Sequence, residues 1–260
     1  MNGDLPKNRV EALKLALKEN PWRFVLLSLL SALFALPLFA YVFYFSFVFS
    51  FPEGNMFALL FFYLGFIPCL CLFLLGQGGL FFSLKKLSFR EGLLLPEDFF
   101  SGIRRNAKES LLTGLFLGID YFVIKIFLAY LPSLSLGTFW STALSAFAYA
   151  LLFLLSIPLL FVLPQSSLYA SSYLSLYLNG WRFFLGKFLP NLGVFLMLLF
   201  PYFLFELLPY LATFVSVALL LSLFYLAFSV FVFVLYSHSI FDKTINEKQF
   251  PELIRKGLEK

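Results

Sequence analysis

The chain has 260 residues, of which 61% are hydrophobic and only 13% charged, and its formal net charge is +5. An ordinary soluble domain is about half apolar and about a quarter charged. A chain of this length has no core large enough to bury so much apolar surface, so its expected solvent is a lipid bilayer. The 39 phenylalanines are expected to face lipid rather than to form a binding surface. The composition excludes an ordinary soluble domain and predicts an all-α, polytopic membrane protein.

Apolar and basic residues are interleaved near the N-terminus. Within residues 1–22, Leu13, Leu17 and Trp22 lie near one face of a helix, and basic side chains surround the rest. This pattern predicts an amphipathic helix on the membrane surface, with Trp22 at the level of the headgroups. The apolar run that starts near Phe24 has no cleavage site after it, so we expect a retained span rather than a signal peptide.

Six apolar segments then follow, each close to or above the roughly 20 residues that cross a bilayer. They are residues 24–49, 55–79, 110–131, 138–163, 187–208 and 211–236. The spans are joined in pairs by short turns at 51–54, 131–133 and 208–210. Four spans contain an internal proline: Pro37, Pro68, Pro158 and Pro201. The pairing predicts three antiparallel hairpins, in which the prolines are either static kinks or hinges.

Basic residues gather on one side of the predicted membrane. Of 19 Lys and Arg, five lie in 7–23, six in 85–108, two in 182–187 and five in 243–260. The three short turns contain none, and Lys125 alone lies in the interior of a predicted span. By the positive-inside rule, both termini are expected in the cytoplasm. This asymmetry explains the net charge, so no nucleic-acid partner is expected.

Two segments that follow the second and fourth spans align without gaps. The shared positions are Gln77/Gln165, Leu80/Leu168, Ser83/Ser171 and Gly92/Gly180. The order of these matches suggests a single membrane domain, 1–260, built from repeat-like units of about 1–92, 93–180 and 181–260. Each unit would be a cytoplasmic amphipathic helix followed by a transmembrane hairpin. The helices of spans 2 and 4 are expected to continue past the bilayer to Gly92 and Gly180.

Residues 76–113 form the only long interior stretch that is rich in charge. Its order of residues is Lys86-Leu87, Arg90-Glu91-Gly92, Asp98-Phe99-Phe100, Asn106, Lys108 and Ser110-Leu111-Leu112. This order resembles the YesL-like family of integral membrane proteins of Gram-positive bacteria, a domain of unknown function. The run Gly76-Gln77-Gly78-Gly79 departs from the family. The resemblance implies a bacterial plasma membrane, an accessory role in carbohydrate uptake beside an ABC transporter, and no catalytic residues.

The charged stretch supplies the candidate surface for docking a partner or binding the membrane surface. Its candidate residues are Lys85, Lys86, Arg90, Phe99, Phe100, Arg104, Arg105, Asn106 and Lys108. The leading hypothesis is a non-enzymatic accessory or scaffold protein of a transport system, which uses the cytoplasmic helix over 93–109 to hold a membrane protein partner. No cofactor or metal is expected, because His238 is the only histidine and Cys69 and Cys71 diverge on a helix.

Ionisable residues inside the spans form a second candidate site. Asp120 and Lys125 lie in the third span, and Glu206 lies near the outer end of the fifth. Such residues are costly in lipid and are candidates for function by default. They are interpreted either as a structural polar clamp, which we favour, or as a proton or cation relay. The relay supports the alternative hypothesis, a small-solute or ion transporter.

Overall fold

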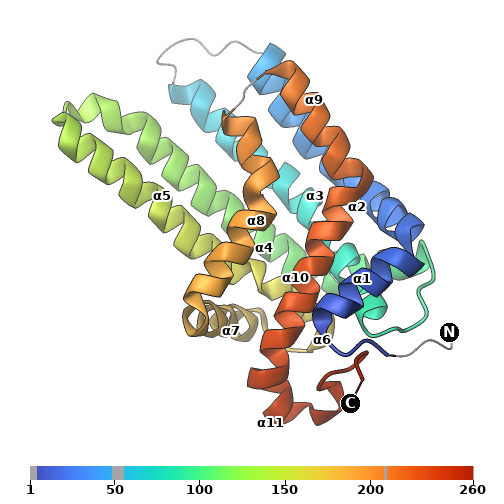
Figure 1. Ribbon diagram of the computed structural model, residues 1–260. Coiled ribbons are helices and arrows are strands. Elements are labelled where there is room, and N and C mark those ends of the chain that lie inside the picture. The colour runs from blue at the N-terminus through green and yellow to red at the C-terminus, as the bar shows by residue number, and fades with distance from the viewer. Residues whose placement is uncertain (1–4, 49–55, 208–209, 260) are drawn as a thin grey trace.

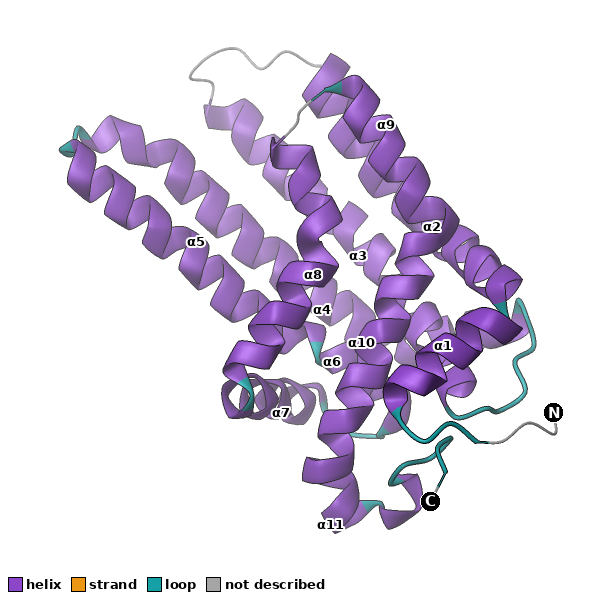
Figure 2. Ribbon diagram, viewed as in Figure 1, coloured by secondary structure: helices purple, strands orange, loops and turns teal. Residues whose placement is uncertain are grey.

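The computed structural model describes residues 5–48, 56–207 and 210–259, without the side chains of residues 199 and 201–207. The described residues form helices and loops and contain no strand (Figure 2). In chain order the helices are α1 (Arg9–Glu19), α2 (Pro21–Phe43), α3 (Met56–Ser88), α4 (Glu97–Tyr130), α5 (Thr138–Leu160), α6 (Val162–Leu168), α7 (Tyr173–Gly186), α8 (Phe188–Leu207), α9 (Leu211–Leu220), α10 (Leu226–Phe241) and α11 (Glu247–Gln249). π-helical turns extend α2 (Tyr44–Val48), join α9 to α10 (Leu221–Tyr225) and follow α10 (Asp242–Asn246).

Five continuous helical stretches in the described chain are long and apolar enough to cross a membrane. They are Pro21–Val48, Met56–Ser88, Glu97–Leu134, Thr138–Leu168 and Leu211–Gln249. The predicted fifth span corresponds to α8, in which the apolar helix over Phe188–Leu198 is shorter than these five. The chain is therefore an all-helical, membrane-embedded protein, and the sixth span and the three-hairpin plan stay predictions. The predicted turns at 51–54 and 208–210 lie wholly or partly outside the described residues.

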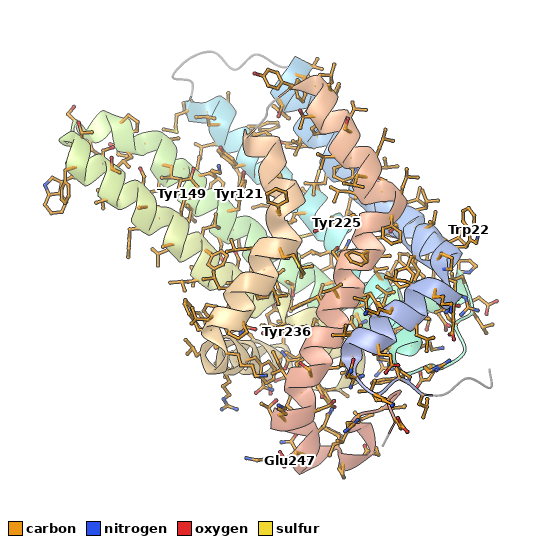
Figure 3. All side chains as sticks on the ribbon, viewed as in Figure 1. Trp22, Tyr121, Tyr149, Tyr225, Tyr236 and Glu247 are labelled. Carbon is orange, nitrogen blue, oxygen red and sulfur yellow. The ribbon has the colours of Figure 1, made fainter. Side chains whose placement is uncertain are left out.

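The long helices run in roughly one direction, and α1 and α7 lie across one end of them (Figure 1). Both ends of the described chain lie at this same end, where the backbone N–H of Glu259 donates to the carbonyl of Pro6 at 2.9 Å. We name this region the charged end, formed by α1, residues 80–109, α6, α7 and residues 237–259. Trp22, in the first turn of α2 directly after α1, projects outward with 76% of its area exposed (Figure 3).

Aromatic side chains fill the core at and just above the charged end. The ring of Phe161 is 5.7 Å from that of Phe183, 5.8 Å from that of Phe195 and 5.3 Å from that of Phe233. Such tilted and edge-to-face pairs each add about 0.5–1.5 kcal/mol beyond the area they bury. The expectation that phenylalanine mainly faces lipid is therefore incomplete, because Phe161, Phe195 and others form the centre of the fold.

Helices α3 and α4 approach each other closely along most of their length. A Cβ atom added at Gly79 would lie 2.7 Å from the carbonyl oxygen of Phe99, and one at Gly114 would lie 2.8 Å from the Cα of Cys71. Small residues allow helix backbones to approach in this way, and in lipid they replace the hydrophobic effect as the basis of packing. The glycines therefore set the spacing of this helix pair both at the charged end and in its apolar part.

The two aligned segments have different ends. Helix α3 continues to Ser88, close to the expected Gly92, but the helix of span 4 stops at Leu168. Residues 169–172 are not helical, and Tyr169 is extended with φ −113° and ψ 134°. The prediction that this helix continues to Gly180 is wrong, because Tyr169 leaves it to donate a hydrogen bond from its hydroxyl to Asn246 at 2.7 Å. The repeat itself stays a prediction.

Candidate functional site

Among the described residues, four ion pairs join different segments at the charged end, three of them across more than 70 residues of sequence. They are Arg9–Asp242 at 2.8 Å, Lys86–Asp98 at 2.7 Å, Arg90–Glu19 at 3.4 Å and Lys256–Glu91 at 2.7 Å. Arg9 also donates to the backbone carbonyl of Lys256 at 3.3 Å. The pairs are partly exposed, so each is worth little alone, but together they fix α1, the 89–96 segment and the C-terminal segment to one another.

Asp98 organises the start of α4, well before the apolar part of that helix. Its carboxylate accepts a hydrogen bond from Lys86 at 2.7 Å and one from the backbone N–H of Leu94 at 2.8 Å. Burial raises the pKa of Asp98, but the hydrogen bonds from Lys86 and Leu94 outweigh it, so the pKa lies below its ordinary value. The negative charge of Asp98 in the first turn also interacts favourably with the positive N-terminal end of the helix dipole.

Lys85 extends from α3 across the charged end toward α6. Its ammonium group donates to the carbonyl of Ser167 at 3.1 Å and lies 4.7 Å from the centre of the Phe82 ring. Burial, together with the nearby Arg105 guanidinium, lowers its pKa to about 8. Lys85 therefore serves to hold α3 against α6 and is not available as a free surface cation.

Its position near the end of an apolar segment would place His238 at the membrane interface, but in the structure His238 is buried. Only 2% of its area is exposed, its ring stacks on Phe89 at 5.0 Å, and its Nδ1 lies 3.3 Å from the Ser88 hydroxyl. Its Nε2 has no hydrogen-bond partner in the described chain. Among the described residues no group of three or more His, Cys, Asp or Glu is placed to hold a metal ion.

The nine candidate docking residues divide into a buried or paired set and an exposed set. Phe99 and Asn106 are buried with 0% and 1% exposed area, and Asn106 donates to the carbonyl of Gly78 at 3.2 Å. Lys85, Lys86 and Arg90 form the contacts described above. The four that remain exposed are Phe100, Arg104, Arg105 and Lys108. Phe100, Arg104 and Lys108 recur every four residues, so they share one outward face of α4.

The candidate site inside the spans is not assembled by the described side chains. Asp120 is half-buried and has no hydrogen bond or ion pair in the described chain. Lys125 of α4 lies over the rings of Tyr121, in the same helix, and Tyr149, in α5, at 5.4 Å and 5.7 Å. Figure 3 labels the two tyrosines. The side chain of Glu206 lies outside the described residues, so its predicted partnership with Asp120 stays a prediction.

The buried amide of Asn191, in α8, fixes this helix to α7 and α10. Asn191 is not among the candidate residues predicted from the sequence. Asn191 is fully buried and donates to the carbonyls of Phe183 and Phe184, at 2.9 Å and 3.1 Å. Its side-chain oxygen accepts a hydrogen bond from the Tyr236 hydroxyl at 2.6 Å. The sequence contained a signal for this contact, because Asn191 is an isolated amide within an apolar segment and a buried amide requires hydrogen-bond partners.

The fold and this site define a class: an all-helical, membrane-embedded protein whose charged residues pack into one organised end of the bundle. Comparisons of the chain with protein-family models, with curated proteins and with solved structures gave no match.

Proposed function

We propose that this chain is a non-enzymatic accessory or scaffold protein of a bacterial transport system. Its partner would be another integral membrane protein, such as the membrane subunit of an ABC transporter for carbohydrates. The observation that carries the proposal is the exposed face of α4 that contains Phe100, Arg104 and Lys108. The rest of the charged end is fastened by ion pairs and buried amides, which suits a rigid platform for a partner.

The composition of this face explains the choice of a membrane protein as the partner. Phe100 is 43% exposed, and neither Arg104 nor Lys108 has an ion pair in the described chain. Further along the same helix, Leu111 and Leu115 are also exposed, at 42% and 40%. A partner that lies alongside α4 would therefore meet an aromatic anchor and two cations near the headgroups and apolar side chains in the bilayer.

Charge reversal on this face tests the proposal. The full-length protein is purified from its native membranes in mild detergent, and the transporter subunits that accompany it are quantified by mass spectrometry. Arg104→Glu/Lys108→Glu is expected to reduce them at least about tenfold. Lys14→Glu/Lys18→Glu, on the exposed side of α1, makes the same charge change elsewhere and is expected to retain them. Equal recovery with both variants, or no transporter subunit with the unchanged protein, would contradict the proposal.

A second candidate function, a small-solute or ion transporter, is supported by one observation. Asp120 is a half-buried carboxylate within the apolar part of α4, without a hydrogen bond or ion pair in the described chain. An ionisable group in that position is a candidate for a proton or cation relay. Asp120→Asn separates the two functions, because a relay loses transport with normal expression, whereas a scaffold keeps its partner.

A further inference from the structure

A cavity of about 640 Å³ lies at the charged end, between α7 and residues 240–250, which comprise the end of α10, the π-helical turn after it and α11. One wall is a single face of α7, on which Ser175, Asn179 and Arg182 recur at helical spacing. The opposite wall comes from Ile240 and from residues 243–250. The volume falls within the range of about 300–1,000 Å³ that is usual for small-molecule sites.

Four cations line this cavity, two from each wall, and the lining contains no carboxylate. They are Arg182 and Lys187 on the side of α7, and Lys243 and Lys248 on the other. None of the four forms an ion pair within the described ranges of the chain. Four other cations at the charged end, Arg9, Lys86, Arg90 and Lys256, do pair with carboxylates. Like charges gathered without counter-charges repel one another, and a bound anion would relieve that repulsion.

The other lining residues restrict the kind of anion. Hydroxyl and amide groups that can donate hydrogen bonds come from Ser171, Ser175, Asn179 and Gln249, whereas the Thr244 hydroxyl already donates to the carbonyl of Ile240 at 2.8 Å. Lys and Arg together with such donors are the groups that bind phosphate in proteins. Apolar surface for a carbon skeleton is supplied by Leu176, Phe183, Ile240 and Phe250. We propose that this cavity binds the phosphate group of an organic phosphate ester.

The location of the cavity allows two sources of that phosphate. Helix α7 exposes Leu174, Leu178 and Leu185 on its outer side, which is typical of a helix at the membrane surface. The apolar helix α8 begins at Phe188, directly after the cationic Lys187. The headgroup of an anionic lipid and a soluble phosphate ester can therefore both reach the four cations, and the experiment distinguishes them.

Two probes that contain the same phosphate test the proposal. In the first arm, glycerol 3-phosphate is titrated calorimetrically into the full-length protein in phosphatidylcholine nanodiscs. In the second, native mass spectrometry counts phosphatidic acid bound in detergent, with phosphatidylcholine as the zwitterionic comparison. Lys243→Gln/Lys248→Gln, which changes two exposed side chains, is expected to weaken binding at least about tenfold. Lys14→Gln/Lys18→Gln, the matched loss of charge on α1, is expected to change it less than about twofold.

Each outcome decides the question. Binding of glycerol 3-phosphate that depends on Lys243 and Lys248 identifies a soluble ester, whereas the same dependence for phosphatidic acid without binding of glycerol 3-phosphate identifies a lipid headgroup. Arg182→Gln, on the other wall, is expected to weaken binding of the same probe as Lys243→Gln/Lys248→Gln. Size-exclusion chromatography checks that each variant is folded. Binding of neither probe, or equal weakening by the α1 control, would overturn the proposal. The cavity does not include the exposed face of α4. The phosphate proposal can therefore hold even if the scaffold function is contradicted, and the two failures are distinguishable.

Discussion

Helix α4 contains Asp98 in its first turn and Asp120 in its apolar part, and the surroundings of these two carboxylates are opposite. Asp98 is buried and its carboxylate accepts hydrogen bonds from Lys86 and from the backbone N–H of Leu94. Asp120, about 33 Å further along at 1.5 Å per residue, is half-buried and has no hydrogen bond or ion pair in the described chain. The contrast indicates that polar contacts specify the geometry of the charged end, whereas the apolar part of the bundle depends on other interactions.

The physical reason for this difference is the solvent. Near water, apolar side chains gain free energy by leaving the solvent, and buried polar groups then need partners. In lipid, that hydrophobic gain is absent, so helices associate through close packing of small residues. Accordingly α4 and α5 diverge from α2 and α9 at the end far from the charged end (Figure 1), while α3 and α4 stay close at Gly114.

The largest expected effect comes from breaking the close approach of α3 and α4 at the charged end. In Gly79→Ala the new Cβ would lie 2.7 Å from the carbonyl oxygen of Phe99 and 2.9 Å from Ile103, so the helices must separate. We expect a loss of about 3 kcal/mol, seen as a melting temperature about 10 °C lower in detergent. Gly193→Ala in α8 is the control, because nothing lies within 4 Å of its Cβ position. Equal melting temperatures for the two variants would show that α3 and α4 are not closely packed.

A smaller effect is expected when Asp98 loses its charge. Asp98→Asn keeps the side-chain shape but leaves Lys86 without its carboxylate, which costs about 1 kcal/mol, or roughly 3 °C in melting temperature, at pH 7. The pKa of Asp98 in the folded protein is below its unfolded value of about 3.9. The stabilisation is therefore present above about pH 4 and is lost as the pH falls through the folded pKa. In melting curves of both proteins from pH 7 to pH 3, the difference should begin to narrow below about pH 4, and a constant difference would contradict this role.

Hydropathy and charge counting predicted the membrane class and the gathering of basic segments at one end, because both depend on local composition. They did not predict which charged-stretch residues are buried. Phe99 and Asn106 lie on the α3-facing side of α4, and His238 meets Ser88 from a helix 150 residues away. Such contacts depend on how distant segments pack, and that packing also ends the helix of span 4 before Tyr169. The exposed face of α4 and the phosphate cavity therefore depend on which side chains this packing leaves exposed, and the sequence alone does not show that.

The smallest effect is expected for Asp120→Asn, the same chemical change as in Asp98→Asn. The amide matches the carboxylate in shape, and no described hydrogen bond or ion pair is lost, so stability should change by less than about 0.5 kcal/mol and the melting temperature by less than about 2 °C. Melting curves in detergent and recovery of transporter subunits check this together. A drop as large as that of Asp98→Asn would show that Asp120 has a structural partner and that the apolar part also depends on polar contacts. A stable variant that has lost solute uptake would instead favour a relay at Asp120 over the scaffold function, because only a relay requires the proton-binding group itself.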